Sequence, residues 1–318
     1  MSIDRNRAGA SLEREILTGY MHANYAESFG EFGTPCALPR CGGTILVRQI
    51  PEFPYYDAMG CYPLFLCHDW SQLHTDLEDL DDELVSLALV TDPFGKYSPV
   101  YLRQCFKDVV IPFKTHFIVD LSCPPNTFVS SHHRRYARKS LRDIQVEECQ
   151  EPLLFYDEWV NLYATLIERH TIRGIPAFSK KAFAKQLQTP GLVMFRAVHN
   201  ETTIGMILWY IQEKVGYYHL AAYNETGYKL RASFALFWSA IEYFADRGLR
   251  WLNLGAGAGI GGNGTDGLSR FKQGWSTETR TAYFCGRIFN PQRYAEIVQT
   301  KNIFGTSYFP AYRQGEFG

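Results

Sequence analysis

The sequence lacks a strong charge of either sign and lacks any long apolar run. Its 32 Lys and Arg residues against 33 Asp and Glu residues leave a formal net charge of −1. This balance argues against a protein whose whole surface attracts nucleic acid or membranes. No apolar stretch approaches the roughly 20 residues that span a bilayer, so we expect no membrane insertion. The N-terminal MSIDRNRAGASLEREIL has no apolar segment typical of a secretory signal, and we expect a cytoplasmic protein.

A compact cysteine pattern is also missing. The eight cysteines are scattered along the chain, and without an export signal we expect them to be reduced and buried. The spacings Cys36-x4-Cys41 and Cys61-x5-Cys67-His68 are not the paired knuckles of a zinc site, so we expect no metal. A serine elbow of the form G-x-S-x-G does not occur, which argues against a hydrolase.

The chain has enough length and apolar content for two packed domains. It has 318 residues, of which 46% are hydrophobic and 15% aromatic, and typical domains hold roughly 100–200 residues. The best boundary is Pro124-Pro125, which follows a strand-like FIVDL and precedes a basic segment. We predict an N-terminal domain over 1–125, a C-terminal domain over 126–295 that carries the active site, and a tail over 296–318.

The hydrophobic patterns predict an α/β or α+β fold with mixed sheets flanked by helices. In the first half we expect an acidic helix and three strands, over 73–84 and over 42–50, 85–92 and 109–121. In the second half we expect three helices and then three antiparallel strands, over 131–142, 157–170 and 179–187 and over 192–199, 203–211 and 215–223. A long helix over 230–247 should set a strand at 250–254 parallel to strand 215–223, before a last strand at 281–289.

The stretch LNLGAGAGIGGNGTDGLSRFKQGW contains Gly257, Gly259 and Gly262 in a G-x-G-x-x-G pattern. A dinucleotide-binding fold needs this pattern in its first strand-helix-strand unit, with further units to follow. Too little chain remains after residue 262, and no Gly-Lys-Ser/Thr ends the run as in a phosphate-binding loop. Two interpretations remain: a flexible turn, or a strand-end loop whose N–H groups approach an oxyanion or a phosphate near Lys272.

The run GYKL…ALFWSAIEYFADRGLRWLNLGAG…GLSRFKQGW resembles the second domain of the FemAB-like branch of the GNAT (N-acyltransferase) superfamily. That pattern is a helix, a strand with an acidic residue, a glycine-rich loop and Phe-Lys-x-x-Trp/Phe-Gly. RRYARKSLRDIQVE and EWVNLYATLIERHTIRGIPAFS are similar to the segments that open the domain. The resemblance covers residues 120–290 well and the first half loosely. The usual Asp of the strand is Asn253 here, and the usual Gly after the aromatic residue is Ser276.

The resemblance implies tandem GNAT-like domains that pass an activated acyl group to an amine. The donor would be acyl-CoA, or aminoacyl-tRNA as in the peptidoglycan-bridge enzymes. The acceptor would be a small-molecule or peptide-like amine that attacks directly, with no tightly bound cofactor and no covalent enzyme intermediate.

Direct aminolysis needs a polarised carbonyl, a deprotonated amine and a held leaving group. Lys272 is the first candidate, as a fixed cation for the oxyanion or for a donor phosphate. His219 and Tyr223 could relay the amine proton, and Asn253 occupies the strand position before the glycine loop. A surface role for Lys272 and a packing role for His219 are the alternatives.

Two further groups of residues are candidates for binding. For the donor they are the start of the long helix, where an anion would offset clustered cations, and the glycine loop: Lys229, Arg231, Ala232, Ser233, Gly255 and Gly257. For the acceptor or for RNA they are one face of strand 215–223, a basic helical stripe and the FKQGW motif: Tyr217, Arg134, Arg138, Phe271 and Trp275. Alternating strand geometry places Tyr217, His219 and Tyr223 on one face and Tyr218 on the other. The basic stripe could equally be a solvated face.

Three functions therefore stay open. The first is an N-acyltransferase that uses acyl-CoA, and the second is an aminoacyl-tRNA-dependent transferase. The third is a degenerate GNAT fold that only binds, which Asn253 favours.

Overall fold

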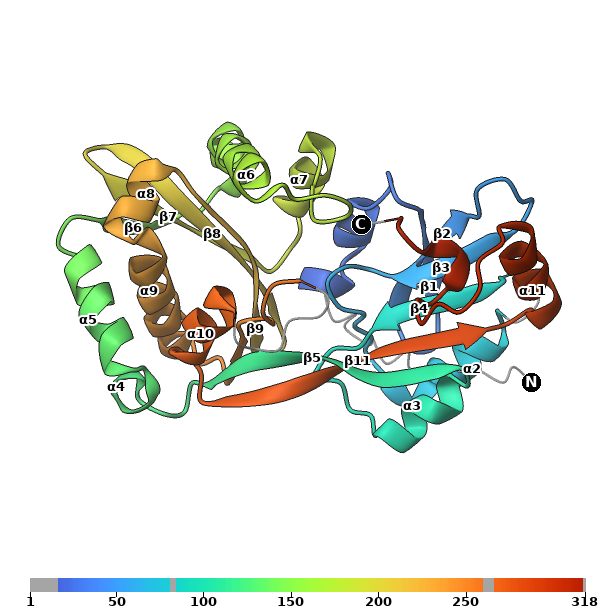
Figure 1. Ribbon diagram of the computed structural model, residues 1–318. Coiled ribbons are helices and arrows are strands. Elements are labelled where there is room, and N and C mark those ends of the chain that lie inside the picture. The colour runs from blue at the N-terminus through green and yellow to red at the C-terminus, as the bar shows by residue number, and fades with distance from the viewer. Residues whose placement is uncertain (1–16, 81–83, 260–265, 317–318) are drawn as a thin grey trace, which may run out of the picture.

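The computed structural model describes residues 17–80, 84–259 and 266–316. Its strands form one eleven-stranded sheet in the order β1-β2-β3-β4-β11-β5-β10-β9-β8-β7-β6. Two lobes lie at opposite ends of this sheet, and the long strands β5 (Val109–Asp120) and β11 (Glu278–Ile288) run between them (Figure 1).

The first lobe carries four strands and several short helices. It contains β1 (Thr34–Leu38), β2 (Gly43–Gln49), β3 (Tyr56–Gly60), η2 (Trp70–Gln72), α2 (Leu73–Glu78), β4 (Ser86–Val90) and α3 (Pro99–Cys105). The preceding η1 (Gly19–Met21) and α1 (Ala23–Glu27) pack against the second lobe. The C-terminal α11 (Pro291–Thr300) and η4 (Ala311–Arg313) join this lobe, because Ile297 and Tyr312 pack against Ile50, Phe53 and Val85.

The second lobe carries five strands and the longest helices. Its elements are α4 (Pro125–Phe128), α5 (Ser131–Ser140), β6 (Gln145–Glu148), η3 (Pro152–Phe155), α6 (Tyr156–His170), α7 (Lys180–Gln186), β7 (Leu192–His199), β8 (Thr202–Gln212), β9 (Val215–Tyr223), α8 (Glu225–Leu230), α9 (Ala232–Asp246), β10 (Trp251–Asn253) and α10 (Gly267–Gln273).

The two lobes repeat one topology and exchange their closing strands. Each has three antiparallel strands, then a helical crossover to a strand parallel to the third: β1-β2-β3 with β4, and β7-β8-β9 with β10. The next strand of each half then pairs in the other lobe, since β5 lies antiparallel to β10 and β11 antiparallel to β4. The fold is therefore a tandem pair of mixed α/β units, as expected.

The second lobe follows the sequence expectations closely. All three expected antiparallel strands form, and β10 lies parallel to β9 across α8 and α9. The expected helix over 230–247 is wrong at its start, because Arg231 adopts a left-handed conformation (φ 58°) that separates α8 from α9. In the first lobe the acidic helix is shorter than expected: α2 ends at Glu78, and residues 81–83 lie outside the described residues.

Two apolar cores cover the two faces of the second lobe's sheet. One packs α5, α9 and α10 against β7 to β10 and contains Trp209, Phe237 and Trp275. The other packs α1, α6 and α7 against the opposite face and extends to Leu46 and Met59 of the first lobe. This second core therefore joins the lobes.

Among the described residues, no helix is both long and apolar enough to cross a membrane. All eight cysteines lie in the described residues and none forms a disulfide; six are buried and two, Cys36 and Cys123, are half-buried. In the described part of the chain, no group of three or more His, Cys, Asp or Glu residues is placed to hold a metal ion.

Candidate active site

A wedge-shaped opening between β9 and β10 is the centre of the candidate site. The two strands pair only from Val215 to Tyr217, opposite Trp251 to Asn253. Beyond this point the chain after β10 follows β5 instead, since the Leu254 N–H bonds to Phe117 O and the Phe117 N–H bonds to Gly255 O. β9 continues to Tyr223. The edge of β9 beyond Tyr217 is thus not paired with β10, and the two strands diverge.

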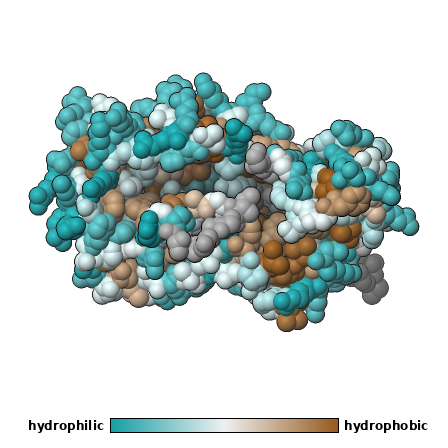
Figure 2. All heavy atoms as spheres, viewed as in Figure 1, coloured by the Kyte–Doolittle hydropathy of each residue, from teal (hydrophilic) through white to brown (hydrophobic). Residues whose placement is uncertain are grey.

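The surface is hollowed beside this gap. Figure 2 shows a depression between α6–α7 and α10, with apolar residues inside it and hydrophilic residues around its rim. Parallel strands that separate beside a helix N-terminus commonly create a ligand cleft.

Lys272 projects from α10 into the wedge. Its Nζ donates to the Ala256 carbonyl at 2.6 Å and lies 5.1 Å from the centre of the Tyr218 ring, so it bridges the two sides of the gap. The side chain is only 3% exposed. Burial lowers the pKa of Lys272 from 10.5 to about 7, although the Asp266 carboxylate opposes this shift. Lys272 is therefore a buried amine that gains or loses its proton near neutral pH.

The glycine loop after β10 is held by side chains on both sides. Asn253 Oδ1 accepts hydrogen bonds from the Gly255 N–H at 2.9 Å and from His116 Nδ1 at 2.9 Å. Gly255 needs its left-handed conformation (φ 75°) to make this turn. Asn253 is 2% exposed, so we interpret its side chain as holding the loop and not as contacting a substrate. The Gly255 N–H is thus already bonded, which contradicts its expected role as a donor to a bound carbonyl or phosphate.

Asp266 fixes the other end of this loop. Its carboxylate caps α10 through the N–H groups of Leu268 and Ser269 and also accepts from the Ala258 N–H. The Ser269 hydroxyl donates to the same carboxylate at 2.5 Å, and this bond together with the backbone N–H groups lowers the pKa of Asp266 to about 2. Gly257 lies against the same cap, because a Cβ there would lie 2.1 Å from Ser269 Oγ. Residues 260–265, including Gly262 of the G-x-G-x-x-G pattern, lie outside the described residues.

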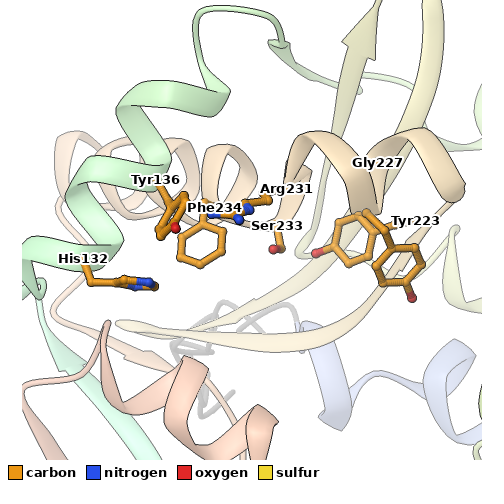
Figure 3. Close-up of a pocket in the computed structure, with 8 residues that line it drawn as sticks. His132, Tyr136, Tyr223, Gly227, Arg231, Ser233 and Phe234 are labelled. Carbon is orange, nitrogen blue, oxygen red and sulfur yellow. The ribbon is translucent and has the colours of Figure 1, made fainter.

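A pocket of about 370 Å³ opens at the N-terminus of α9. Its walls come from α5 and from the end of β9 through α8 to α9: His132, Tyr136, Tyr223, Gly227, Tyr228, Arg231, Ser233 and Phe234. Figure 3 shows the labelled residues arranged around a common space. The Arg231 guanidinium lies 3.8 Å from the centre of the Tyr136 ring, and no side chain caps α9. The first N–H groups of α9 and a cation thus face one pocket, an arrangement that suits an anion.

The pocket and the wedge lie along the same face of β9. Tyr223 lines the pocket and Tyr218 lies under Lys272, and both rings pack on the α9 side of the sheet. A bulge explains this: Leu208 pairs with Leu220 and Trp209 with Tyr218, so His219 is an extra residue. The expectation that Tyr217, His219 and Tyr223 share one face is therefore wrong for Tyr223: Tyr217 and His219 do share a face, but the bulge reverses the alternation after residue 219.

His219 lies on the opposite face, in a ring-lined core. Its Nε2 is 3.2 Å from Gln186 Oε1 and its Nδ1 is 3.2 Å from the Tyr20 hydroxyl. The amide oxygen accepts, so the proton is on Nε2 and Nδ1 accepts from Tyr20. Burial lowers the pKa of His219 to about 3. His219 is thus a neutral, hydrogen-bonded core histidine that does not face Lys272.

Tyr217 also points to this opposite face, where it meets the first lobe. Its hydroxyl donates to Asp92 Oδ2 at 2.9 Å. Burial raises the pKa of Asp92 to about 7, against the effect of the bonds from Phe94 N–H and Tyr217. The pair links β9 to the chain just after β4, and Tyr217 therefore contacts the other lobe.

The remaining expected residues divide between structural and exposed positions. Arg134 bonds the carbonyls of Asn126 and Val129 and so holds the turn before α5, whereas Arg138 is exposed on α5. Phe271 packs behind Phe234, a wall of the pocket. Trp275 is fully buried in the core, which contradicts a direct contact with a substrate.

Of the residues expected to bind the donor at the start of α9, some line the pocket and others do not. Arg231 and Ser233 line the pocket, and Ala232 is buried at the first position of the helix. Lys229 is exposed and pairs with Glu225 at 2.8 Å, four residues earlier on α8. Its charge is therefore directed to the surface of α8.

The sequence did not reveal the aromatic wall of the pocket. His132, Tyr136 and Phe234 come from two helices that meet only in the folded chain. The one available signal was SHHRRYARKS, in which His132 and Tyr136 are four residues apart and therefore adjacent on a helix.

Gly274 of the FKQGW motif allows α10 to pack closely on α5. A Cβ at this position would lie 2.1 Å from the His133 ring, whose Nε2 bonds the Phe271 carbonyl at 2.9 Å. We expect Gly274→Ala to lower the free energy of unfolding by about 1–3 kcal/mol, because the ring is held on both sides and cannot move freely. Urea titration measures this change.

Gly267→Ala is the matched control, because Gly267 begins the same helix and a Cβ there meets nothing within 4 Å. We expect this variant to be neutral or more stable by up to about 1 kcal/mol. Equal stability of the two variants would contradict the close packing of Gly274 on His133.

Comparison with known proteins finds a family match in the second lobe. The model of the acetyltransferase (GNAT) domain matches residues 130–273, which include α5, α9, the wedge and Lys272. No curated protein matches the chain in sequence.

Solved structures share the fold over nearly the whole chain. FemX has a TM-score of 0.64 at 13% identity, over 87% of this chain and 93% of that chain. The C-terminal domain of a putative lysylphosphatidylglycerol synthetase from Agrobacterium fabrum has a TM-score of 0.63 at 13% identity, over 90% and 91%. L-PGS from Bacillus licheniformis has a TM-score of 0.58 at 15% identity, over 91% and 98%.

These findings agree with the resemblance noted in the sequence from the basic helix to the FKQGW motif. Residues 130–273 match the acetyltransferase (GNAT) domain, and the chain as a whole shares the fold of FemX.

Proposed function

We propose that the second lobe transfers an acyl group from acyl-CoA to an amine by direct aminolysis. The observation that carries the proposal is Lys272, a buried amine placed between Tyr218 of β9 and Ala256 after β10. The family match supports acyl transfer as the class of reaction.

The donor would lie along the α9 side of β9. Its phosphates would bind in the pocket at the start of α9, where Arg231 and the first N–H groups of the helix attract anions. Its acyl end would then reach the wedge past Tyr223 and Tyr218. Protonated Lys272 would stabilise negative charge on the carbonyl oxygen, since a cation in a water-poor site acts strongly on developing charge.

The reaction itself needs no covalent enzyme intermediate. The amine nitrogen attacks the thioester carbon, the C–N bond forms and the C–S bond breaks. The thiolate leaves, and the proton released by the amine balances it through solvent. Between these two events the Lys272 ammonium group stabilises the negative charge on the carbonyl oxygen. Lys272 is still protonated when the reaction ends.

Arg231→Ala tests the donor pocket. We expect it to weaken binding of acetyl-CoA by about five- to tenfold, because it removes a cation worth roughly 1 kcal/mol beside the phosphates. Calorimetry measures the dissociation constant. Lys229→Ala is the control, since Lys229 is exposed and paired with Glu225, and its affinity should not change. Equal losses in both variants would contradict a specific pocket at Arg231.

An aminoacyl-tRNA donor is the second candidate, and the surface of α5 favours it. Beside the pocket this helix and the turn after it expose four cations: Arg135, Arg138, Lys139 and Arg142. Such a row can contact the phosphates of an RNA. A tRNA dissociation constant that rises steeply with salt, without acetyl-CoA binding, would select this donor over acyl-CoA. Failure of both donors to bind would favour a GNAT fold that serves as a binding module.

A further inference from the structure

A second cavity, of about 420 Å³, lies in the first lobe and is unrelated to the wedge. Its walls come from the turn after α1, from strands β1 to β3 and from the C-terminal segment: Gly30, Glu31, Phe32, Gly33, Thr34, Val47, Arg48, Gln49, Tyr56 and Arg313. After α11 the C-terminal segment runs back across this lobe toward the middle of the molecule (Figure 1). It brings Arg313 beside Arg48 of β2.

Both arginines are buried and both are held by one carboxylate. Arg48 and Arg313 are each 6% exposed, and Asp57 is fully buried. Arg313 donates to Asp57 from Nε at 2.8 Å and from Nη2 at 3.0 Å, and Arg48 donates from Nε at 3.2 Å. Asp57 orients the two guanidinium groups but neutralises only one of their two charges.

The second charge is balanced by Glu316, close to the C-terminal end of the chain. Both Nη1 atoms point to its carboxylate: Arg48 Nη1 lies 3.2 Å from Oε2 and Arg313 Nη1 lies 3.0 Å from Oε1. Two converging guanidinium groups are the geometry that binds a carboxylate. A buried cation without a partner is costly, so this site requires an anion.

Glu316 differs from the other three members of the network. Arg48 and Asp57 are paired strand residues, and Arg313 is anchored beside Tyr312, whose hydroxyl lies 2.7 Å from Ser86 Oγ. Glu316 instead sits on an exposed turn after Gly315 (φ 83°), and its side chain is 29% exposed. The turn can therefore lift its carboxylate away while both arginines stay in place.

We propose that Arg48 and Arg313 form a binding site for the carboxylate of a small ligand, and that Glu316 occupies it as a tethered substitute. The cavity gives the rest of the ligand room beside Tyr56 and Gln49. Gly33 belongs to the same site, because a Cβ there would lie 2.8 Å from Arg48 Cγ and displace the guanidinium. The ligand class is a carboxylate with a compact polar body, such as an N-acylated amino acid.

Calorimetry with N-acetylglycine and its neutral analogue N-acetylglycinamide tests the site without any acyl donor. Glu316→Gln removes the tethered competitor, whose effective concentration is on the order of millimolar. We therefore expect N-acetylglycine to bind this variant about tenfold or more tightly than it binds the wild type, and N-acetylglycinamide to bind neither. In the Glu316→Gln background, Arg48→Lys should weaken N-acetylglycine binding again. Lysine keeps the positive charge but lacks the paired N–H donors with which a guanidinium group binds a carboxylate.

Glu296→Gln is the matched control, because the Glu296 side chain on α11 accepts a hydrogen bond from the Tyr55 hydroxyl at 3.1 Å and does not line the cavity. It should leave the affinity for N-acetylglycine at the wild-type value. Equal affinity of wild type and Glu316→Gln overturns the proposal, as does equal binding of the acid and the amide by Glu316→Gln. Tightening in Glu296→Gln also overturns it, since a general loss of negative charge would then explain the effect.

Discussion

Lys272→Met is expected to lower kcat/KM for acyl transfer from acetyl-CoA by about 10²–10³. Loss of one group that stabilises an oxyanion typically has this effect, and methionine keeps the length of the side chain without its charge. Release of free thiol from acetyl-CoA, with ethylamine in excess as the acceptor, measures the rate. The far-ultraviolet circular dichroism and the urea midpoint of the variant show whether the fold is retained.

The pH dependence separates a cationic role of Lys272 from a basic one. The pKa of Lys272 is about 7, so the ammonium form dominates below pH 7 and the neutral amine above it. If the ammonium form stabilises the oxyanion, the ratio of wild-type to Lys272→Met activity is largest below pH 7. It then falls by up to about tenfold per pH unit above pH 7. Using the ratio removes the titration of the acceptor amine, which both proteins share.

A ratio that increases above pH 7 would show instead that the neutral amine of Lys272 accepts a proton. A ratio near one at every pH would remove Lys272 from the site altogether. Gln273→Ala provides the control, because Gln273 is the exposed neighbour of Lys272 on α10, and its activity should equal that of the wild type.

The sequence was sufficient to predict those elements whose structure is decided by local patterns. The antiparallel strands β7 to β9 and the parallel position of β10 follow from short turns and a helical crossover. Lys272 could also be picked out as a candidate, because it follows Phe271 in a motif of a known family, and its catalytic role stays a prediction. The division into domains at residue 125 stays a prediction, although the exchange of β5 and β11 ties each lobe to the other half of the chain.

The predictions that failed concern residues whose positions depend on contacts between distant parts of the chain or on one inserted residue. The bulge at His219 moved Tyr223 to the face of Tyr218, and no alternation rule can locate such an insertion in advance. Asn253 was a candidate for chemistry, yet it bonds Gly255 and His116, 137 residues away in the chain. Arg313 and Glu316 lie in a segment that was expected only to be a tail, and their partners lie on β2 and β3.

Two buried histidines are expected to make the protein sensitive to acid. Burial lowers the pKa of His116 to about 4 and of His219 to about 3, against about 6.5 in an unfolded chain. Below pH 6.5 the unfolded state therefore binds more protons than the folded state. Each histidine then removes about 1.4 kcal/mol of unfolding free energy per pH unit. Asp92 acts in the opposite direction, because its raised pKa of about 7 makes the folded state bind a proton first as the pH falls.

A variant of one histidine isolates its contribution from that of Asp92. His219→Gln should destabilise the protein at pH 7, because the ring leaves a packed core with Tyr25, Tyr210 and Phe178. The cost should be about 2 kcal/mol smaller at pH 5, since only the wild type must then keep His219 neutral against its tendency to protonate. Urea titrations of both proteins between pH 7 and 5 measure this difference. His170→Gln, at the exposed end of α6, should show no such change, and a cost of His219→Gln that is independent of pH would mean that water reaches His219 in the folded state.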